Sequence, residues 1–354
     1  MDSNFWKNKK VLLTGHTGFK GSWLSLWLQK LGVDLVGFSK SIPTQPSLFE
    51  LANVGKNMIS VMKDISNIQH ISDTVKQFKP DIVIHMAAQS LVQKSYEDPL
   101  ETFSTNIMGT VNLLEAIRNT DRKCVIINVT SDKCYENQEL TRGYTENDPM
   151  GGYDPYSSSK GCAELITSSF RNSFFKNSND EEFDVSLASV RAGNVIGGGD
   201  WADNRIVPDI MRGIINKKII KIRNPNAIRP WQHVLEPLRG YLELAEKLWN
   251  DKKEFAESWN FGPDVDNVKP VSWIVKEIIE MWGGDIQIDI DNLNYKHETN
   301  FLKLDCSKAK SKLKWNPKIK LEKGLQLTVE WYKQYEQKKE LKEFTENQIE
   351  EYAY

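Results

Sequence analysis

The sequence predicts an α/β protein with a doubly wound parallel sheet and a smaller mixed α/β domain towards the C-terminus. Through the first half of the 354 residues, short apolar runs alternate with amphipathic stretches. This alternation is typical of a parallel sheet with helices on both faces. From about residue 200 proline and tryptophan become frequent, as in Ile228-Arg229-Pro230-Trp231. We expect a first domain at 1–185 with returning segments near 186–200 and 229–250, a second mainly at 200–340, and a charged tail at 341–354.

Apolar runs and periodicity place the elements of the first domain. We predict strands at Val11–Thr14, Leu35–Phe38, Met58–Met62, Asp81–Met86 and Cys124–Val129. Helices are predicted at Ser22–Leu31 and at Asn106–Asn119, where apolar residues recur on one stripe. Four candidate functional segments, 15–21, 87–90, 130–133 and 192–200, directly follow predicted strands. The ligand crevice of a doubly wound sheet lies at the carboxyl ends of its strands, so we expect these segments to meet there.

Composition excludes several classes of partner. Hydrophobic residues make up 40% and charged residues 27%, as in soluble globular proteins. A net charge of −2 gives no reason to expect nucleic acid or an anionic membrane as partner. The sequence has no apolar stretch of membrane-spanning length, and its N-terminus is polar. The four scattered cysteines, Cys124, Cys134, Cys162 and Cys306, predict free thiols in a reducing cytoplasm and no metal site.

The segment after the first strand carries a cofactor signature. Gly15, Gly18 and Gly21 stand between a strand and a helix, where glycines let backbone amides approach a diphosphate at the helix N-terminus. The second strand ends Gly37-Phe38-Ser39-Lys40 without an acidic residue, and Lys40 would tolerate a 2′-phosphate, so the residues leave NAD or NADP open. The expected cofactor-binding residues are Gly15, His16, Thr17, Gly18, Phe19, Lys20, Gly21, Ser39, Asp64, Ile65, Ala87, Ala88, Gln89, Asn106, Tyr156 and Lys160.

A hydroxyl, a carboxyl, a phenol and an ammonium form the candidate catalytic group. Tyr156 and Lys160 are one helical turn apart, and the ammonium can favour the phenolate. Such a pair occurs roughly once by chance, and Tyr335 with Lys339 is a second example, which we interpret as a solvated helix face. Ser131-Asp132-Lys133 follows a predicted strand. Alcohol oxidation does not need the Asp132 carboxyl, whereas expulsion of hydroxide as water needs an acid.

These motifs resemble the extended short-chain dehydrogenase/reductases with a Rossmann-type domain and, within them, the CDP-glucose 4,6-dehydratases. The resemblance covers nearly the whole chain, through stretches 14–24, 87–90, 131–137, 156–160, 191–201, 229–231 and 313–317. The glycine loop and the Tyr-Lys pair are shared by the superfamily. Three further motifs are specific to a narrower group within the superfamily: His16 with Lys20, Ser131-Asp132-Lys133, and Gly197-Gly198-Gly199-Asp200-Trp201.

The resemblance implies an NAD-dependent hydro-lyase that converts CDP-glucose to CDP-4-dehydro-6-deoxyglucose. Tyr156 takes the 4-hydroxyl proton as hydride passes from C4 to NAD, and Asp132 protonates the departing 6-hydroxyl. Hydride then returns to C6. The family also implies Ser131, Lys133 and Lys160 as further catalytic residues, Ser90, Asn194, Arg229 and His297 as substrate ligands, and a homodimer through two helices beside the active site. The implied pathway supplies deoxysugars for bacterial surface polysaccharide such as the lipopolysaccharide O antigen.

Several alternatives remain open at the level of sequence. Lys133 stands where related dTDP-sugar dehydratases carry a glutamate base, and deprotonating a lysine at pH 7 costs about 4.6 kcal/mol. It is therefore either the C5 base or, as we slightly favour, a charged stabiliser. A sugar-nucleotide 4-epimerase, a non-catalytic NAD-binding protein and an NADPH-dependent reductase are the rival functions. His85 is interpreted as a buried histidine with satisfied hydrogen bonds.

Overall fold

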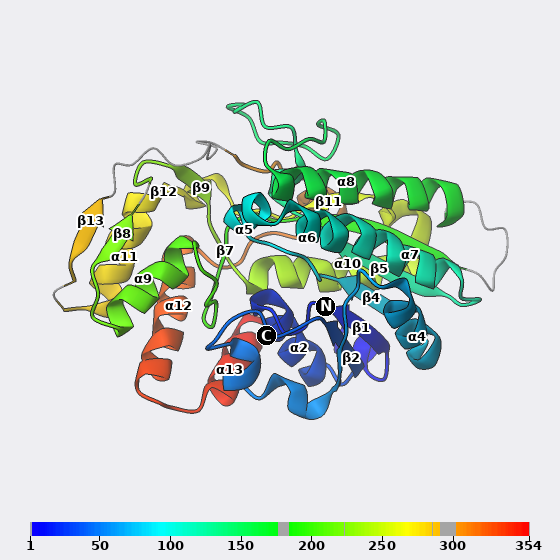
Figure 1. The fold of residues 1–354 in the computed structure, drawn as a ribbon, viewed down its shortest axis with the longest axis horizontal. Helices are drawn as coiled ribbons and strands as arrows, with labels where there is room; N and C mark the ends of the chain where they lie inside the picture. The colour runs from blue at the N-terminus through cyan, green and yellow to red at the C-terminus, as the bar shows by residue number, and fades with distance from the viewer. Residues whose placement is uncertain (1, 176–183, 223, 285, 291–301, 354) are drawn as a thin grey trace.

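The central sheet has seven parallel strands among the residues that the computed structural model describes, which are 2–175, 184–222, 224–284, 286–290 and 302–353. Their order is β11-β6-β5-β4-β1-β2-β3 (Figure 1). The predicted fold class is confirmed. The strands are β1 (Lys10–Thr14), β2 (Asp34–Ser39), β3 (Ile59–Met62), β4 (Ile82–His85), β5 (Cys124–Val129), β6 (Val185–Arg191) and β11 (Ser258–Asn260).

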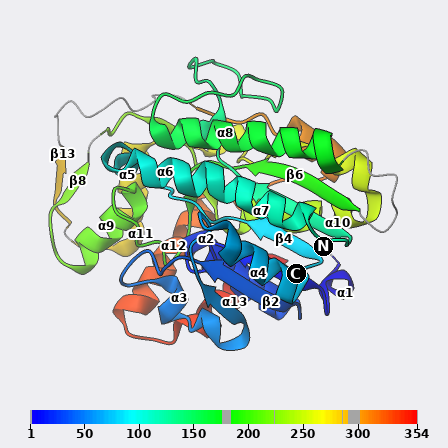
Figure 2. The same cartoon turned by 45° about the vertical axis from the view of Figure 1, so that its right-hand side comes forward.

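Helices cover both faces of this sheet, which explains why its inner strands are continuously apolar. Val11 and Leu13 point into the larger core with α2 (Phe19–Lys30) and α10 (Leu235–Phe255). Leu12 points the other way, into a core with α4 (Ile68–Phe78) and α7 (Gly109–Arg118). The helix α8 (Pro155–Phe170) packs beside α7 on that second face (Figure 2).

Predicted boundaries differ from the structure mainly where helices begin. The expected helix at Ser22–Leu31 begins at Phe19, because Gly18 already serves as its N-cap and Gly21 lies inside the first turn. The expected helix at Asn106–Asn119 is preceded by the π-helical turn η2 (Ser104–Met108), and α7 proper begins at Gly109. Such wide turns are frequent at functional sites.

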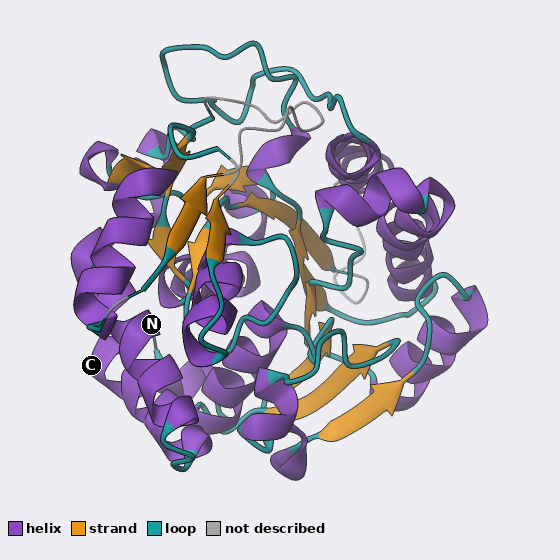
Figure 3. Ribbon diagram, turned by 60° about the vertical axis from the view of Figure 1, so that its left-hand side comes forward, coloured by secondary structure: helices purple, strands orange, loops and turns teal. Residues whose placement is uncertain are grey.

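A smaller group of helices and short strands stands apart from the central sheet and is seen from another side in Figure 3. It contains α9 (Ile206–Ile215), β8 (Ile220–Ile222), β9 (Ile228–Pro230), β12 (Val268–Pro270), α11 (Val271–Trp282) and β13 (Ile288–Ile290). The short strands β7 (Val195–Ile196) and β10 (Gln232–His233) pair with each other, β7 after β6 and β10 just before α10. The chain returns as α10 and then as β11, which pairs with β6. The sequence did not indicate β11.

The last residues form a docked helix. Helix α12 (Leu321–Glu336) leads into α13 (Leu341–Ala353), which packs against α2. The ring centroids of Trp27 and Tyr352 are 5.9 Å apart. Tyr335 stacks on Trp331 with centroids 6.3 Å apart, so it does not lie on the fully solvated face that we expected for the Tyr335–Lys339 pair.

Shorter elements complete the described chain. They are α1 (Ser3–Trp6), α3 (Leu48–Leu51), η1 (Val54–Asn57), α5 (Val92–Glu97), α6 (Pro99–Phe103), η3 (Asp132–Cys134), η4 (Arg171–Phe175), η5 (Val265–Asn267) and η6 (Ala309–Leu313). Among the described residues, no helix combines the length and the apolar composition that a bilayer span requires.

Candidate active site

The glycine loop packs its backbone closely over the end of β1. Gly15 has φ +77°, and a Cβ there would lie 2.7 Å from the Met86 carbonyl carbon. A Cβ on Gly21 would lie 2.0 Å from the Gly15 carbonyl oxygen. Gly18 is the N-cap of α2 and has no side chain to bond the first-turn amides. Those amides and the positive end of the helix therefore suit a diphosphate.

His16 bonds this loop to the next two strands, β2 and β3. Its Nδ1 lies 2.9 Å from Ser39 Oγ and its Nε2 lies 2.7 Å from Ser60 Oγ. Burial lowers the pKa of His16 to about 4, although the backbone of Phe38 acts in the opposite direction. His16 is therefore neutral at pH 7. Gly37 makes room for its ring, since a Cβ there would lie 2.3 Å from His16 Cγ.

The end of β2 carries an ionic cluster. Lys40 Nζ lies 3.0 Å from Asp64 Oδ2 and 3.5 Å from Glu101 Oε1. Asp64 also accepts hydrogen bonds from the backbone and hydroxyl of Ser66. Two carboxylates therefore compete with a 2′-phosphate for the Lys40 ammonium. The one sequence feature in favour of NADP is thereby weakened.

The segment after β4 is tied to α8 through Asn106. Asn106 Nδ2 donates to the Gln89 carbonyl at 3.0 Å and to Ser159 Oγ at 2.8 Å, while its Oδ1 accepts from the Gln89 amide. The π-helical turn places this side chain inward. Ala87 is held from the other side, by a hydrogen bond from its amide to Thr14 Oγ1 at 3.1 Å. The cofactor segments after β1 and β4 are thus joined to the helix that carries Tyr156.

Tyr156 and Lys160 both face the interior from the first turns of α8. The helix begins sharply because Asp154 caps it and Pro155 occupies its first position. Burial raises the pKa of Tyr156 to about 12, Asp132 adds to this, and a hydrogen bond with Ser131 opposes it. Lys160 Nζ donates to the Val129 carbonyl at 3.3 Å, and burial lowers its pKa to about 8.

Asp132 is a buried carboxyl beside this pair. Ser131 Oγ donates to Asp132 Oδ1 at 3.0 Å, and the backbone amide of Lys133 donates to Ser131 Oγ at 3.2 Å. Burial raises the pKa of Asp132, although Lys133 and Arg229 act to lower it. The carboxyl stands over Gly193, where a Cβ would come within 1.9 Å of Oδ2. A carboxyl with a raised pKa is suited to donate a proton.

Arg205 joins this group, although no motif in the sequence selects it. Its guanidinium donates to Asp200 Oδ2 at 3.0 Å and to Ser90 Oγ at 3.1 Å. Among the cations around Tyr156, Arg205 has the largest lowering effect on the phenol pKa, a role we expected of Lys160. The one available signal was its position in the loop between Asp200 and the apolar run of α9.

Lys20 is a further cation directed into the crevice. Its ammonium donates to Tyr241 Oη at 3.0 Å. Burial, followed by the charges of Lys160 and Arg205, lowers the pKa of Lys20 to about 7. Binding an anion beside it would restore its positive charge, which is consistent with a diphosphate at the neighbouring helix N-terminus.

The expected substrate ligands occupy different parts of the crevice. Ser90 is exposed and accepts the hydrogen bond from Arg205. Asn194 has φ +35° and its carbonyl accepts from the Gln232 amide at 3.2 Å. Arg229 lies on β9 and acts electrostatically on Asp132. His297 lies outside the described residues.

His85 has the expected structural role. Its Nδ1 lies 2.7 Å from Thr14 Oγ1 and its Nε2 lies 3.2 Å from Thr110 Oγ1, so both ring nitrogens have partners. Burial lowers the pKa of His85 to about 3. The four cysteines are free thiols, and the described residues contain no cluster of side chains that could hold a metal ion.

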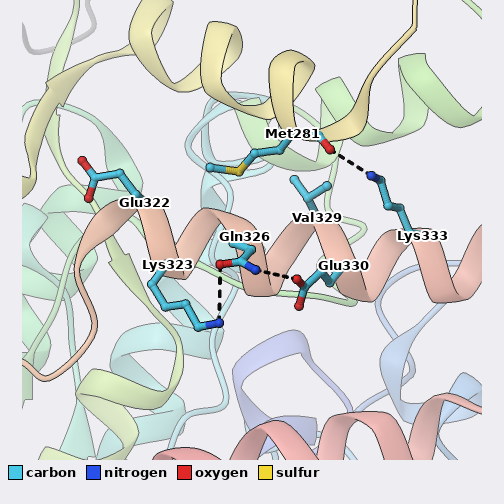
Figure 4. A pocket seen from close by; sticks show the side chains of 7 residues that line it. All are labelled: Met281, Glu322, Lys323, Gln326, Val329, Glu330 and Lys333. Atoms are coloured by element: carbon cyan, nitrogen blue, oxygen red, sulfur yellow. Dashed lines mark hydrogen bonds between the residues drawn. The ribbon is translucent and has the colours of Figure 1, made fainter.

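Two grooves lie apart from these residues. The first, of about 450 Å³, runs between α11 and α12 (Figure 4). Within it, Gln326 donates to Glu330 at 2.7 Å and Lys333 donates to the Met281 carbonyl at 2.9 Å. The second, of about 380 Å³, lies between the C-terminal ends of α4 and α7. Neither groove includes an expected site residue.

Comparisons with known proteins agree with this geometry. The model of the family described as GDP-mannose 4,6 dehydratase matches residues 12–328. CDP-glucose 4,6-dehydratase from Salmonella typhimurium is 53% identical over 333 residues, 94% of this chain and 93% of that protein. A dTDP-glucose 4,6-dehydratase from Haemophilus influenzae is 25% identical, over 91% of this chain and 97% of its own.

Solved structures share the fold. UDP-glucose 4-epimerase from Thermotoga maritima superposes with a TM-score of 0.79 at 23% identity, covering 92% of this chain and 99% of that one. dTDP-glucose 4,6-dehydratase from Bacillus anthracis, solved in complex with NAD, has a TM-score of 0.75 at 22% identity, covering 92% and 97%. At these identities the structural likeness extends to the fold alone.

Proposed function

Because the chain belongs to the GDP-mannose 4,6-dehydratase family, we propose that it is an NAD-dependent hydro-lyase that converts CDP-glucose to CDP-4-dehydro-6-deoxyglucose. The observation that carries this proposal is the buried Asp132 carboxyl, which lies beside Ser131 and has a raised pKa. A 4-epimerase expels nothing and has no use for such an acid. The 53% identity to a CDP-glucose 4,6-dehydratase supports both the reaction and the substrate.

Residues of the first domain would hold the dinucleotide. The first-turn amides of α2 and the glycines of the loop would hold its diphosphate, and Asp64 and Ile65 would hold its adenosine end. Asn106 and Gln89 fix the segment after β4 against which the cofactor would lie. When bound, the nicotinamide supplies the hydride acceptor for C4 and the hydride donor for C6.

The side chains supply the proton transfers. Tyr156 removes the proton of the 4-hydroxyl, with Ser131 as its hydrogen-bond partner and Arg205 favouring the phenolate. Loss of hydride makes C4 a ketone, which acidifies the C5 proton. Asp132 then protonates the 6-hydroxyl as the C6–O bond breaks, and water leaves. Tyr156, Asp132 and Ser131 thereby act on one sugar from one side of the crevice.

Lys133 and the outer cations hold the negative parts of the substrate. We assign Lys133 as a charged group that stabilises the enolate formed when another group or water takes the C5 proton. Arg229, half-buried on β9, is placed to bind the diphosphate of the sugar nucleotide, with Asn194 and Ser90 as further ligands. His297 is proposed as a further substrate ligand on the family resemblance alone.

A homodimer through α7 and α8 also forms part of the proposal. Exposed apolar side chains lie on α8 itself and on α6, η2 and η4, the elements that precede α7 and follow α8 in the chain. Leu100 is 77% exposed, Leu165 61%, Met108 49% and Phe174 44%. A second copy that covered these side chains would bury them. The proposed location is the cytoplasm, supported by the four free thiols and by the nucleotide-sugar substrate.

Incubation with CDP-glucose and NAD tests the proposed function. We expect one molecule of water to be lost from the sugar nucleotide, measured by mass spectrometry, with one NAD serving many turnovers. Conversion to CDP-galactose would identify an epimerase instead. Stoichiometric consumption of NADPH would identify a reductase, and binding without conversion a non-catalytic protein. The same incubation with dTDP-glucose and GDP-mannose tests the choice of nucleotide.

A further inference from the structure

A buried ion pair lies directly behind the catalytic side chains. Arg191, the last residue of β6, donates from Nε to Glu164 Oε1 at 2.9 Å and from Nη2 to Glu164 Oε2 at 2.8 Å. Both side chains are 3% exposed. Glu164 is on α8, one turn beyond Lys160, and α8 runs along β6 (Figure 2). The ion pair therefore locks the helix of Tyr156 and Lys160 to the sheet.

The same ion pair holds the residue that precedes the catalytic segment Ser131–Cys134. The hydroxyl of Thr130 donates to Glu164 Oε1, and the Thr130 amide donates to the Val190 carbonyl at 2.9 Å. Since Ser131 is the next residue, these bonds fix the position of its hydroxyl relative to α8.

The ion pair also holds the residue that follows this segment. Arg191 Nη1 donates to Tyr135 Oη at 2.6 Å, and Tyr135 Oη donates to Asn260 Oδ1 at 2.8 Å. The guanidinium lies 4.8 Å from the centroid of the Tyr135 ring. Tyr135 is 1% exposed. The two ends of Ser131–Cys134 are thus bonded to the two partners of one ion pair.

We propose that Glu164, Arg191 and Tyr135 form a positioning clamp that holds Asp132 and Lys133 over the sugar during elimination of water. The backbone of α8 positions Tyr156 and Lys160. Asp132 and Lys133, by contrast, belong to a single 3-10 turn, and Tyr135 fixes the end of that turn. Loosening the Tyr135 end should therefore slow elimination more than the first hydride transfer. This inference rests on the proposed dehydratase function.

The test measures the rates of oxidation at C4 and of elimination separately in the Tyr135→Phe variant. This substitution removes one hydroxyl and keeps the ring. In a single turnover, reduced nicotinamide reports the oxidation at C4 and the 4-keto-6-deoxy product reports elimination. We expect elimination to slow by about tenfold or more, because displacing a reacting group by about 1 Å costs on the order of a hundredfold. Reduced nicotinamide should form at the wild-type rate and accumulate. The KM for CDP-glucose should stay within about twofold of wild type.

Tyr144→Phe is the matched control. The Tyr144 ring stacks on Tyr135 with centroids 5.2 Å apart, but its hydroxyl bonds to Asn137 and to the amide of Gln138 rather than to Arg191. It should keep the wild-type ratio of the two rates. Thr130→Val is the second variant if Tyr135→Phe does not fold. Because the Thr130 substitution loosens the end of the segment that carries Ser131, it should slow hydride transfer as well as elimination.

Two results would overturn the clamp: equal slowing of both steps in Tyr135→Phe, or no change in either step. A wild-type enzyme without dehydratase activity would instead refute the proposed function, so the two failures are distinguishable.

Discussion

The carboxyl of Asp132 lies over the Cα of Gly193, so closely that a Cβ at position 193 would approach Oδ2 to 1.9 Å. Asp132 follows β5 and Gly193 follows β6, two neighbouring strands of the sheet. The acid is therefore held against backbone on one side and bonded by Ser131 on the other. Its burial, which raises its pKa, is a consequence of this contact between two strand ends.

Gly193→Ala is expected to displace this acid selectively. The atom that an added methyl group would meet is the far end of the Asp132 side chain, which can rotate away without moving the backbone. We expect a loss of dehydration of about a hundredfold from misplacement of one group. Formation of reduced nicotinamide from substrate should persist. The rates are measured in a single turnover, alongside the thermal midpoint.

Gly324→Ala is the control for this substitution. Gly324 is in α12, and a Cβ there would meet its nearest neighbour at 3.4 Å. Wild-type activity is expected, with equal or greater stability, since alanine is favoured over glycine in a helix by about 1 kcal/mol. A wild-type rate of dehydration in Gly193→Ala would show that the position of the Asp132 carboxyl is not critical for the reaction.

Lys133→Ala separates the two roles that this residue could have. If Lys133 is a charged stabiliser, the variant should turn over more slowly, by about tenfold to a hundredfold, but should still incorporate solvent deuterium at C5. Nuclear magnetic resonance of the product made in D₂O measures this incorporation. Complete loss of C5 exchange, with C4 oxidation preserved, would make Lys133 the base.

Arg205→Gln should move the pH profile of hydride transfer upward. Burial is the main cause of the raised pKa of Tyr156, and the Arg205 charge opposes it. Removal of that charge favours the neutral phenol, so deprotonation requires a higher pH. At pH 7 we expect about a tenfold slower oxidation at C4. Arg205→Lys retains a cation and should shift the profile less; identical profiles for the wild type and Arg205→Gln would exclude the electrostatic role.

Three buried histidines predict acid lability. Burial lowers the pKa of His16 to about 4, and of His85 and His233 to about 3. In the unfolded chain their pKa is about 6.5, so the unfolded state binds more protons below that pH. Stability is complete above pH 6.5 and falls as the pH drops from 6.5 towards 4. Each histidine contributes up to about 1.4 kcal/mol per pH unit.

Urea unfolding at pH 7, 6 and 5 measures this loss of stability. In His233→Leu the dependence of stability on pH should decrease by up to about 1.4 kcal/mol per pH unit, whatever the effect of the substitution on stability at pH 7. An unchanged slope would show that His233 is not neutral and buried in the folded protein.

The features that the sequence predicted well depend on local spacing. The glycine loop after β1, the Tyr156–Lys160 turn and the apolar runs of the strands can all be recognised within a few residues. Arg205 could not be selected in this way, because its partners Ser90 and Tyr156 are distant in sequence. The Glu164–Arg191 pair and β11 are likewise defined by contacts between separate strands and helices. For the charged tail, a helix or a frayed end is what the sequence predicts; its docking on α2 could not be predicted, because the two helices are distant in sequence.

Transfer of a label within one sugar tests the proposed reaction most directly. CDP-glucose carrying deuterium at C4 is incubated with the enzyme and less than one equivalent of NAD, and the product is examined by nuclear magnetic resonance. If Tyr156 opens the reaction and Asp132 completes the loss of water, the deuterium should be found at C6 of the 4-keto-6-deoxy product. Deuterium that remains at C4, or that appears in free reduced cofactor, would contradict the assignment as a dehydratase.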